Sequence, residues 1–174
     1  MDHRKTAGPT LLVLLLICLA MGAWGLKTLK QGFPDSPIST SSGPYCIERT
    51  VERGAEVYPQ DVMVSVYNAG TEAGSATRTM SDLVDRGFAR GLTGNVKSKL
   101  RFVQVWAEDP DNPAVQLVAR QFGKGTKIAR VRPEMGEGVV VVVGDRLRGL
   151  KPRVGKVTAA ARATICSPPL DATE

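Results

Sequence analysis

The feature that most constrains the fold is an unbroken run of valines, Val139–Val143, which stands between Gly138 and Gly144. A strand with one face in water alternates apolar and polar residues, whereas this run has no polar position. Such a strand is covered on both faces or lies at the centre of its sheet. The run therefore predicts a layered domain built around a β-sheet.

Other segments carry the pattern of further strands. Residues 62–67 and 101–107 alternate, which turns their valines to one face and Tyr67 and Trp106 to the other. The remaining assignments are a short strand at 88–92, a loop at 93–99 and a strand at 126–131.

Two amphipathic helices are predicted between the strands. The first has apolar residues at i, i+4, i+7 and i+8 from Ala76 and is expected to end at Gly87. In the second, Asn112 can cap the free amides, Pro113 suits the first helical position and Gly123 can close the far end. The element order predicts an α/β fold, a two-layer sandwich with a mixed sheet of about four to five strands and both helices on one face.

Near the N-terminus, residues 10–26 are apolar throughout. As a helix this segment spans about 25 Å, slightly less than the ~30 Å hydrocarbon core of a membrane. Two alternatives to an uncleaved anchor stay open. One is signal-peptide cleavage after Gly22, and the other is lipid modification of Cys18. We expect a cytoplasmic tail over 1–9, one transmembrane signal-anchor over 10–29 and a flexible tether over 30–46.

Two cysteines, Cys46 and Cys166, stand near the two ends of the remaining chain. Neither lies in a CxxC pair, and no histidine follows the apolar segment to share a metal ion. A disulfide between them would enclose a domain over residues 47–150 and bring the C-terminal extension, 151–174, back to Cys46. It would also indicate an oxidising compartment outside the membrane. The alternative is a pair of free thiols.

The net charge of +6 overstates how basic the domain is, because the chain from Gln31 onward carries only +3. This is a weak argument for nucleic-acid binding. The basic residues gather in one acid-free run after the valine strand: Arg146, Arg148, Lys151, Arg153 and Lys156. Such a run can meet an anionic wall polymer or lipid headgroups, or it can be a solvated, flexible segment.

The residues after the first strand, Asn68–Gly70, raise the question of a phosphate-binding loop. They match neither of the two glycine-rich phosphate motifs, so we predict a turn in which Asn68 and Gly70 adopt a left-handed backbone. Gly74 is expected to let the next helix lie close to the sheet, and the N-terminus of that helix stays a candidate anion site. A second glycine-rich stretch, 123–127, follows a helix and precedes a strand, so it is predicted to be a loop.

Catalytic and metal-binding groups are sparse. The single histidine, His3, precedes the apolar segment, which excludes a Ser-His or Cys-His nucleophile pair from the domain. Two carboxylate pairs, Asp82 with Asp85 and Asp109 with Asp111, are expected to be surface and capping residues. We predict no catalytic residue, no metal ligand and no cofactor.

Aromatic side chains suggest a binding surface. Tyr67 and Trp106, with Phe102 beside them, would form a platform on which sugar rings stack. The alternative is that the segments tied by Cys46 and Cys166 cover these aromatic side chains as a second small core.

The order and spacing of these motifs resemble the LytR C-terminal domain family over about residues 61–145. The motifs that carry the resemblance are VSVYNAG at 64–70, Gly74, LVDRGF at 83–88, Asn95, LVARQFG at 117–123 and VVVVVGD at 139–145. The family occurs in actinobacteria and other Gram-positive lineages, behind wall-polymer transferases of the LytR-CpsA-Psr type or alone after a membrane helix.

For this chain, the resemblance implies the lone-domain form. That form would be a non-catalytic, membrane-anchored, extracytoplasmic module that supports the cell envelope by binding wall polymer or envelope-assembly proteins. The alternatives are an accessory subunit or enzyme of wall-polymer transfer and a transcription-related role, although no nucleic-acid partner is expected. The candidate binding residues are Asn68, Gly70, Tyr67, Trp106, Arg146 and Arg148.

Overall fold

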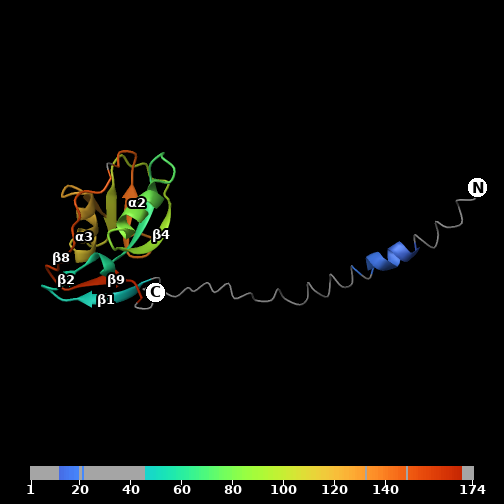
Figure 1. The fold of residues 1–174 in the computed structure, drawn as a ribbon, viewed down its shortest axis with the longest axis horizontal. Coiled ribbons are helices and arrows are strands. Elements are labelled where there is room, and N and C mark those ends of the chain that lie inside the picture. Colours follow the sequence, from blue (N-terminus) through green and yellow to red (C-terminus); the bar gives the residue numbers. More distant parts are fainter. Residues whose placement is uncertain (1–11, 20, 22–45, 132, 148, 170–174) are drawn as a thin grey trace, which may run out of the picture. The chain divides into compact units, whose positions relative to one another are not determined.

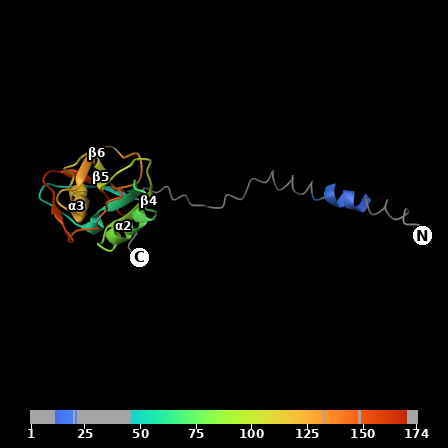
Figure 2. The same cartoon turned by 90° about the horizontal axis from the view of Figure 1, so that it is seen from above.

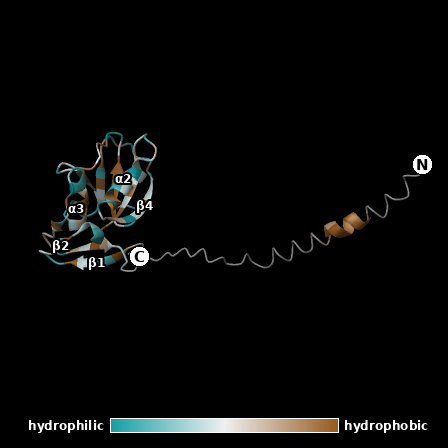
Figure 3. Ribbon diagram, viewed as in Figure 1, coloured by the Kyte–Doolittle hydropathy of each residue, from teal (hydrophilic) through white to brown (hydrophobic). Residues whose placement is uncertain are grey.

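The computed structural model describes residues 12–19, 21, 46–131, 133–147 and 149–169. The chain divides into two units, Met1–Gly43 and Pro44–Glu174, each of which we describe by itself. In the first unit, residues 12–19 form a short, exposed, apolar helix (Figure 3). Within the described ranges, no helix combines the length and apolar character that a membrane crossing requires. The predicted tail lies outside these ranges, as do parts of the predicted anchor and all of the tether except Cys46. All three therefore stay predictions.

The second unit is built on a five-stranded mixed sheet (Figure 1). In spatial order its strands are β4 (Ala89–Asn95), β3 (Met63–Asn68), β7 (Val139–Val143), β5 (Gln104–Ala107) and β6 (Lys127–Arg130). β3 runs parallel to both of its neighbours, β5 is parallel to β6, and β5 is antiparallel to β7. The valine strand β7 is central and all five of its side chains are buried, which confirms the prediction from the valine run.

Both helices, α2 (Ser75–Val84) and α3 (Pro113–Phe122), cover the same face of this sheet (Figures 1 and 2). The predicted α/β architecture with two helices on one face is therefore confirmed. Alternate residues of the strands and one stripe of each helix form a single apolar cluster. Its members include Val64, Val66, Met80, Leu83, Val105, Leu117, Val118 and Val141.

The helix ends follow the predicted punctuation. Asn112 Oδ1 accepts a hydrogen bond from the backbone N–H of Ala114 at 3.0 Å, and Pro113 is the first residue of α3. Gly123 follows α3 with φ of 122°. Gly87 follows α2 with φ of 92°, and its N–H donates to a carbonyl of the last turn at 2.8 Å. In both helices, glycine adopts a backbone conformation that other residues rarely take.

One predicted boundary is wrong at β4, because residues 93–95 belong to the strand and not to a loop. The parallel register with β3 pairs Tyr67 with Gly94 and Asn68 with Asn95. β4 is an edge strand, and its exposed residues do not have to follow an apolar alternation.

A second boundary is wrong at β5, which begins at Gln104 instead of Arg101. The carbonyls of Leu100 and Arg101 accept hydrogen bonds from the N–H groups of Asp145 and Arg146, at 3.2 and 2.8 Å. Since these carbonyls bind the chain after β7, the residues before Gln104 do not continue the sheet ladder.

Four short strands from the two ends of the domain were not predicted. Val51, Val157 and Ile165 from these strands belong to the apolar cluster beneath the helices. β1 (Ile47–Val51) pairs antiparallel with β9 (Ala163–Ser167), β2 (Glu56–Val57) pairs antiparallel with β8 (Val157–Thr158), and a 3-10 turn spans Pro59–Asp61.

The predicted disulfide between Cys46 and Cys166 is confirmed. The two residues are 120 positions apart in the sequence, and their Cα atoms lie 5.4 Å apart. The bond therefore closes almost the whole domain into one covalent ring. A second link fixes β9 to the start of α3, since Asn112 Nδ2 donates to the carbonyl of Thr164 at 2.8 Å.

Candidate functional site

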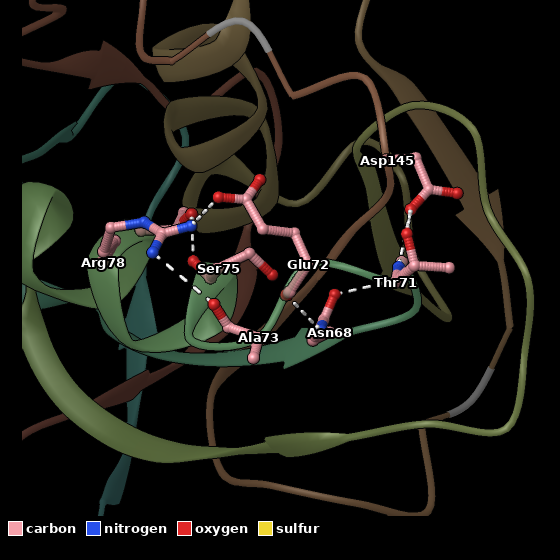
Figure 4. A network of polar contacts seen from close by, with 9 residues as sticks. Asn68, Thr71, Glu72, Ala73, Ser75, Arg78 and Asp145 are labelled. Carbon is pink, nitrogen blue, oxygen red and sulfur yellow. Dashed lines mark hydrogen bonds and ion pairs between the residues drawn. The ribbon is translucent and has the colours of Figure 1, made fainter.

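The turn after β3 is held by polar side chains (Figure 4). Asn68 Oδ1 accepts a hydrogen bond from the N–H of Gly70, and its Nδ2 donates to the carbonyl of Glu72, both at 2.9 Å. Asp145 Oδ1 accepts from the N–H of Thr71 at 2.6 Å and from its hydroxyl at 2.9 Å. These donors, the backbone amide first, hold the pKa of Asp145 below its ordinary value. Asn68 and Asp145 therefore shape this turn.

Two glycines near this turn have roles opposite to those predicted. In the described chain no residue other than glycine has a positive φ, and Gly70 does not have one either. A Cβ at Gly70 would instead meet Asp145 Oδ1 at 2.8 Å and Asp145 N at 3.0 Å. Gly74 has φ of 76°, and a Cβ there would make only an ordinary contact of 3.6 Å with Arg78. The left-handed backbone predicted at Asn68 and Gly70 and the close approach predicted at Gly74 are therefore wrong, because side-chain hydrogen bonds make the turn.

The N-terminus of α2 is surrounded by carboxylates. A hollow of about 480 Å³ at this point is lined by Glu72, Asp82 and Asp145, together with Arg78. Arg78 forms an ion pair with Glu72 (Figure 4). The buried hydroxyl of Ser75 has no hydrogen-bond partner among the described residues. The helix dipole attracts anions, but the surrounding negative charge opposes them, so this place does not favour an anionic ligand.

Tyr67 and Trp106 do not form an exposed platform. Tyr67 is only 8% exposed and lies in a second small apolar cluster, on the sheet face away from the helices. Burial raises the pKa of its hydroxyl. Trp106 packs against this cluster, and loop residues such as Leu100 and Met135 cover it. The second small core that was the alternative prediction is therefore observed. Loop residues cover it, whereas the segments tied by the disulfide pack into the larger apolar cluster beneath the helices.

A cleft of about 770 Å³ lies beside the C-terminal end of α3. We call it the basic cleft, and the described residues of its three walls come from 101–104, from 122–127, and from 146–147 with 149–151. No Asp or Glu stands among the described residues that line it. Exposed cationic side chains come from all three walls, and they are Arg101, Lys124, Lys127, Arg146 and Lys151.

Backbone hydrogen bonds hold the three walls together. The N–H of Arg146 donates to the carbonyl of Arg101 at 2.8 Å, and the N–H of Lys151 donates to the carbonyl of Gln121 at 2.7 Å. Within the middle wall, the Thr126 hydroxyl donates to the carbonyl of Gly123 at 2.9 Å. The backbone positions are therefore fixed while the charged ends of the side chains reach solvent.

A buried amide fixes the third wall further. Gln121 is fully buried, and its Nε2 donates to the carbonyl of Val154 at 2.8 Å. Its Oε1 accepts from Arg86 at 2.7 Å, and Arg153 donates to the carbonyl of Arg86 at 2.8 Å. This network attaches the chain after the cleft to α3 and to the turn that follows α2.

The basic run predicted from the sequence divides between two roles. Arg146 and Lys151 line the cleft, whereas Arg153 contacts Arg86 and Lys156 pairs with Glu56. The run is therefore not one solvated, flexible segment. The side chain of Arg148 lies outside the described residues.

Sequence reasoning missed three of the cleft's cations, Arg101, Lys124 and Lys127. The two lysines belong to the glycine-rich stretch 123–127, which is a loop and the start of β6, as predicted. Their charge was visible in the sequence, but about 20 residues of chain separate each wall of the cleft from the next one. Only the folded sheet brings them together.

One aromatic side chain also lines the basic cleft. Phe102 is 55% exposed, and the guanidinium carbon of Arg101 lies 5.9 Å from its ring centroid. Phe102 was predicted to lie beside Tyr67 and Trp106, but it precedes β5 and lines a different surface.

One of the two predicted carboxylate pairs forms a turn, and one group of potential metal ligands lies at the disulfide. Asp109 Oδ1 accepts from the N–H of Asp111 at 3.0 Å, which is a turn contact. Glu137 lies near Cys46 and Cys166, with all three potential ligand atoms within 4.8 Å of one another. The two sulfur atoms are bonded to each other, and a thiolate is the form that binds a metal ion.

Comparison with known proteins places the sheet and both helices in a family. The family model described as LytR cell envelope-related transcriptional attenuator matches residues 61–146. No curated protein matches the chain. Among solved structures, the chain is similar to the soluble domain of a conserved hypothetical secreted protein (Rv2700 ortholog) from Mycobacterium marinum. That match has 20% identity and a TM-score of 0.44, and it covers 55% of this chain and 66% of the other, just under two thirds. Residues 61–146, from the end of the 3-10 turn before β3 to the first residues after β7, are therefore a domain of the LytR_C family.

Proposed function

We propose that this chain is a non-catalytic, membrane-anchored module of the cell envelope whose extracytoplasmic domain binds an anionic wall polymer. The observation that carries the proposal is the basic cleft, where cations from three separate segments meet without an acidic residue among the described lining. The family description, cell envelope-related, supports this setting. The disulfide supports an oxidising compartment outside the membrane.

The physical reason is electrostatic. Five exposed cations around one hollow repel one another and create a positive potential that a polyanion relieves. Single contacts between exposed charges are worth only about 0.2–1 kcal/mol. A polymer with repeated negative charges makes several such contacts at once, so the weak interactions combine. We therefore expect binding that weakens strongly with added salt, since the Debye length is about 10 Å at 0.1 M.

Two rival functions make different predictions. An enzyme or accessory subunit of wall-polymer transfer would release or move polymer units, so turnover in a lipid-linked transfer assay would favour it. A transcription-related nucleic-acid binder would need a cytoplasmic domain. Protease treatment of intact cells tests this, because an extracytoplasmic domain is cleaved and a cytoplasmic one is protected.

The binding test uses the full-length chain in neutral detergent, mixed with isolated Gram-positive cell walls before and after chemical removal of their anionic polymers. We expect co-sedimentation with intact walls and its loss with stripped walls. The variant Lys127→Glu/Arg146→Glu should bind intact walls about tenfold more weakly or worse, because it reverses charge on two walls of the cleft.

The matched control is Arg53→Glu/Lys97→Glu, which changes net charge equally at exposed residues outside the cleft. It should bind like the natural protein. Equal losses in both variants would show that net charge, and not the cleft, governs binding. Undiminished binding to stripped walls would overturn the proposal in favour of a wall component other than the anionic polymers.

A further inference from the structure

We propose that the basic cleft binds a phosphodiester-linked glycan, with phosphate groups on its cations and a sugar ring against Phe102. This inference rests on the proposed function, since it names the chemical class of polymer that the same site takes.

The exposed ring of Phe102 distinguishes the cleft from a purely charged surface. Phe102 is 55% exposed in a hollow whose other exposed side chains are mainly cationic. Aromatic rings offer a flat apolar face, and sugar rings present a matching apolar face of C–H groups. A ligand of phosphate alone would leave this ring in water, whereas a sugar phosphate covers it.

Arg101 lies where the proposed phosphate contact and the proposed sugar contact meet. Its guanidinium carbon lies 5.9 Å from the Phe102 centroid, at the limit of a cation–π contact. Guanidinium groups bind phosphate oxygens through paired N–H donors. A phosphate on Arg101 therefore holds the sugar attached to it within reach of Phe102.

The number of cations favours more than one phosphate. A phosphodiester carries one negative charge, and the cleft presents five cationic side chains from its three walls. Several successive phosphodiesters are needed to balance them. The volume of about 770 Å³ falls in the range of sites that hold drug-sized ligands, so a few sugar-phosphate units fit.

The surface continues beyond the cleft. A second hollow of about 550 Å³ shares Gly123, Lys124 and Thr126 with the first and adds Arg120. Its described lining also holds no Asp or Glu. Lys124 thus faces both hollows, and a chain longer than one cleft can pass across the loop that separates them. This favours a polymer over a single sugar phosphate.

Single-stranded nucleic acid also alternates phosphates with rings, but the site fits it less well. Proteins that bind single strands stack successive bases on several aromatic side chains. Phe102 is the one exposed aromatic residue among the described residues that line the two hollows. Single-stranded DNA is therefore included as a competing ligand in the binding test.

The test measures binding of the full-length chain, in neutral detergent, to oligomers of equal length. The probes are glucose units joined by phosphodiesters, inorganic polyphosphate of the same charge, uncharged malto-oligosaccharide and single-stranded DNA. We expect the phosphodiester glycan to bind most tightly. Phe102→Ala should weaken glycan binding about tenfold and leave polyphosphate binding within about twofold, because it removes only the stacking surface.

Two further variants serve as controls for the effect of Phe102→Ala. Phe102→Leu keeps an apolar side chain without a flat ring and should also lose most of the glycan preference. Tyr58→Ala removes a partly exposed aromatic residue outside the cleft and should leave all probes unchanged.

The outcomes separate the two proposals. Equal glycan affinity of the natural protein and of Phe102→Ala would overturn this inference. Binding of polyphosphate by both proteins would in that case still support an anion-binding site. Tighter binding of DNA than of the glycan, with dependence on Phe102, would overturn it in favour of nucleic acid. Failure of every anionic probe to bind would overturn the proposed function itself.

Discussion

Thr71 donates both its backbone N–H and its hydroxyl to one carboxylate oxygen of Asp145, at 2.6 and 2.9 Å. The two residues are 74 positions apart in the sequence. The contact joins the turn after β3 to the chain that leaves β7. Because Arg146 follows directly, the same contact also helps to fix where one wall of the basic cleft begins.

Replacing Gly70 should disturb this contact. Gly70→Ala places a Cβ 2.8 Å from Asp145 Oδ1, so the carboxylate must move and its bonds to Thr71 weaken. We expect a loss of about 1–3 kcal/mol in the free energy of unfolding, measured by urea denaturation. Gly74→Ala should cost about 1–2 kcal/mol for a different reason, its φ of 76°.

A double-mutant cycle distinguishes the two causes. In an Asp145→Ala background, Gly70→Ala should cost less, because the nearest atom is gone. The cost of Gly74→Ala should not change. If Gly70→Ala costs the same in both backgrounds, close approach to the carboxylate is not the reason for glycine there.

Asp145 should make stability depend on acidity in a defined direction. Its folded pKa is lowered from the ordinary 3.8 by hydrogen bonds from Thr71, backbone first. The stabilising contribution is therefore complete well above pH 3.8, and it is lost as the pH falls through the lower folded pKa. Urea midpoints of the natural protein and Asp145→Asn should differ at pH 7 and converge in acid.

The variant Thr71→Val tests the origin of this effect. It removes the hydroxyl donor and keeps the amide, which contributes the larger part of the pKa shift. It should therefore retain most of the acid dependence. A constant difference between the natural protein and Asp145→Asn from pH 7 down to strong acid would contradict this assignment.

The disulfide should be a major source of stability. Cys46 and Cys166 enclose a ring of about 120 residues, and loop closure on that scale stabilises by about 4–5 kcal/mol on the chain-entropy model. Cys46→Ser/Cys166→Ser should lose much of this in urea denaturation. Cys18→Ser, at the free and exposed cysteine of the other unit, is the control and should change little.

Non-reducing peptide mass spectrometry on protein purified from its own cells checks the bond directly. Detection of both Cys46 and Cys166 as free thiols would contradict the pairing and the oxidising compartment. An effect of the double variant below about 1 kcal/mol would contradict its stabilising role alone.

The buried amide of Gln121 should be sensitive to truncation. Gln121→Ala leaves the Arg86 guanidinium and the Val154 carbonyl without their partner, and we expect a loss of about 2–4 kcal/mol. Gln60→Ala, at an exposed glutamine, should stay within about 0.5 kcal/mol of the natural protein. Similar unfolding midpoints for the two variants would show that this network adds little.

Trp106 should matter for stability and not for binding. Trp106→Ala removes packing from the second cluster and should cost about 2–3 kcal/mol, while cell-wall binding remains. Phe102→Ala should show the reverse pattern, since Phe102 is exposed in the cleft. Weaker wall binding by a folded Trp106→Ala protein would return the sugar platform to that face of the sheet.

Local chemistry in the sequence determined the main elements. Val139–Val143 has no polar position, so it had to be a covered strand, and Asn112, Pro113 and Gly123 mark both ends of α3. These signals are local because they arise from side-chain burial and from backbone groups within one turn. The pairing of Cys46 with Cys166 was predictable because no other cysteine follows the apolar segment.

Only the tertiary structure decided which distant residues meet. The order β4-β3-β7-β5-β6 brings Arg101, Lys127 and Arg146 to one cleft, and it places Tyr67 in a core and Phe102 at the surface. Alternation along a strand tells which residues share a face, but not which loops cover that face. Charged side chains in loops follow no apolar period, so their meeting depends on the sheet order and on the backbone hydrogen bonds between walls.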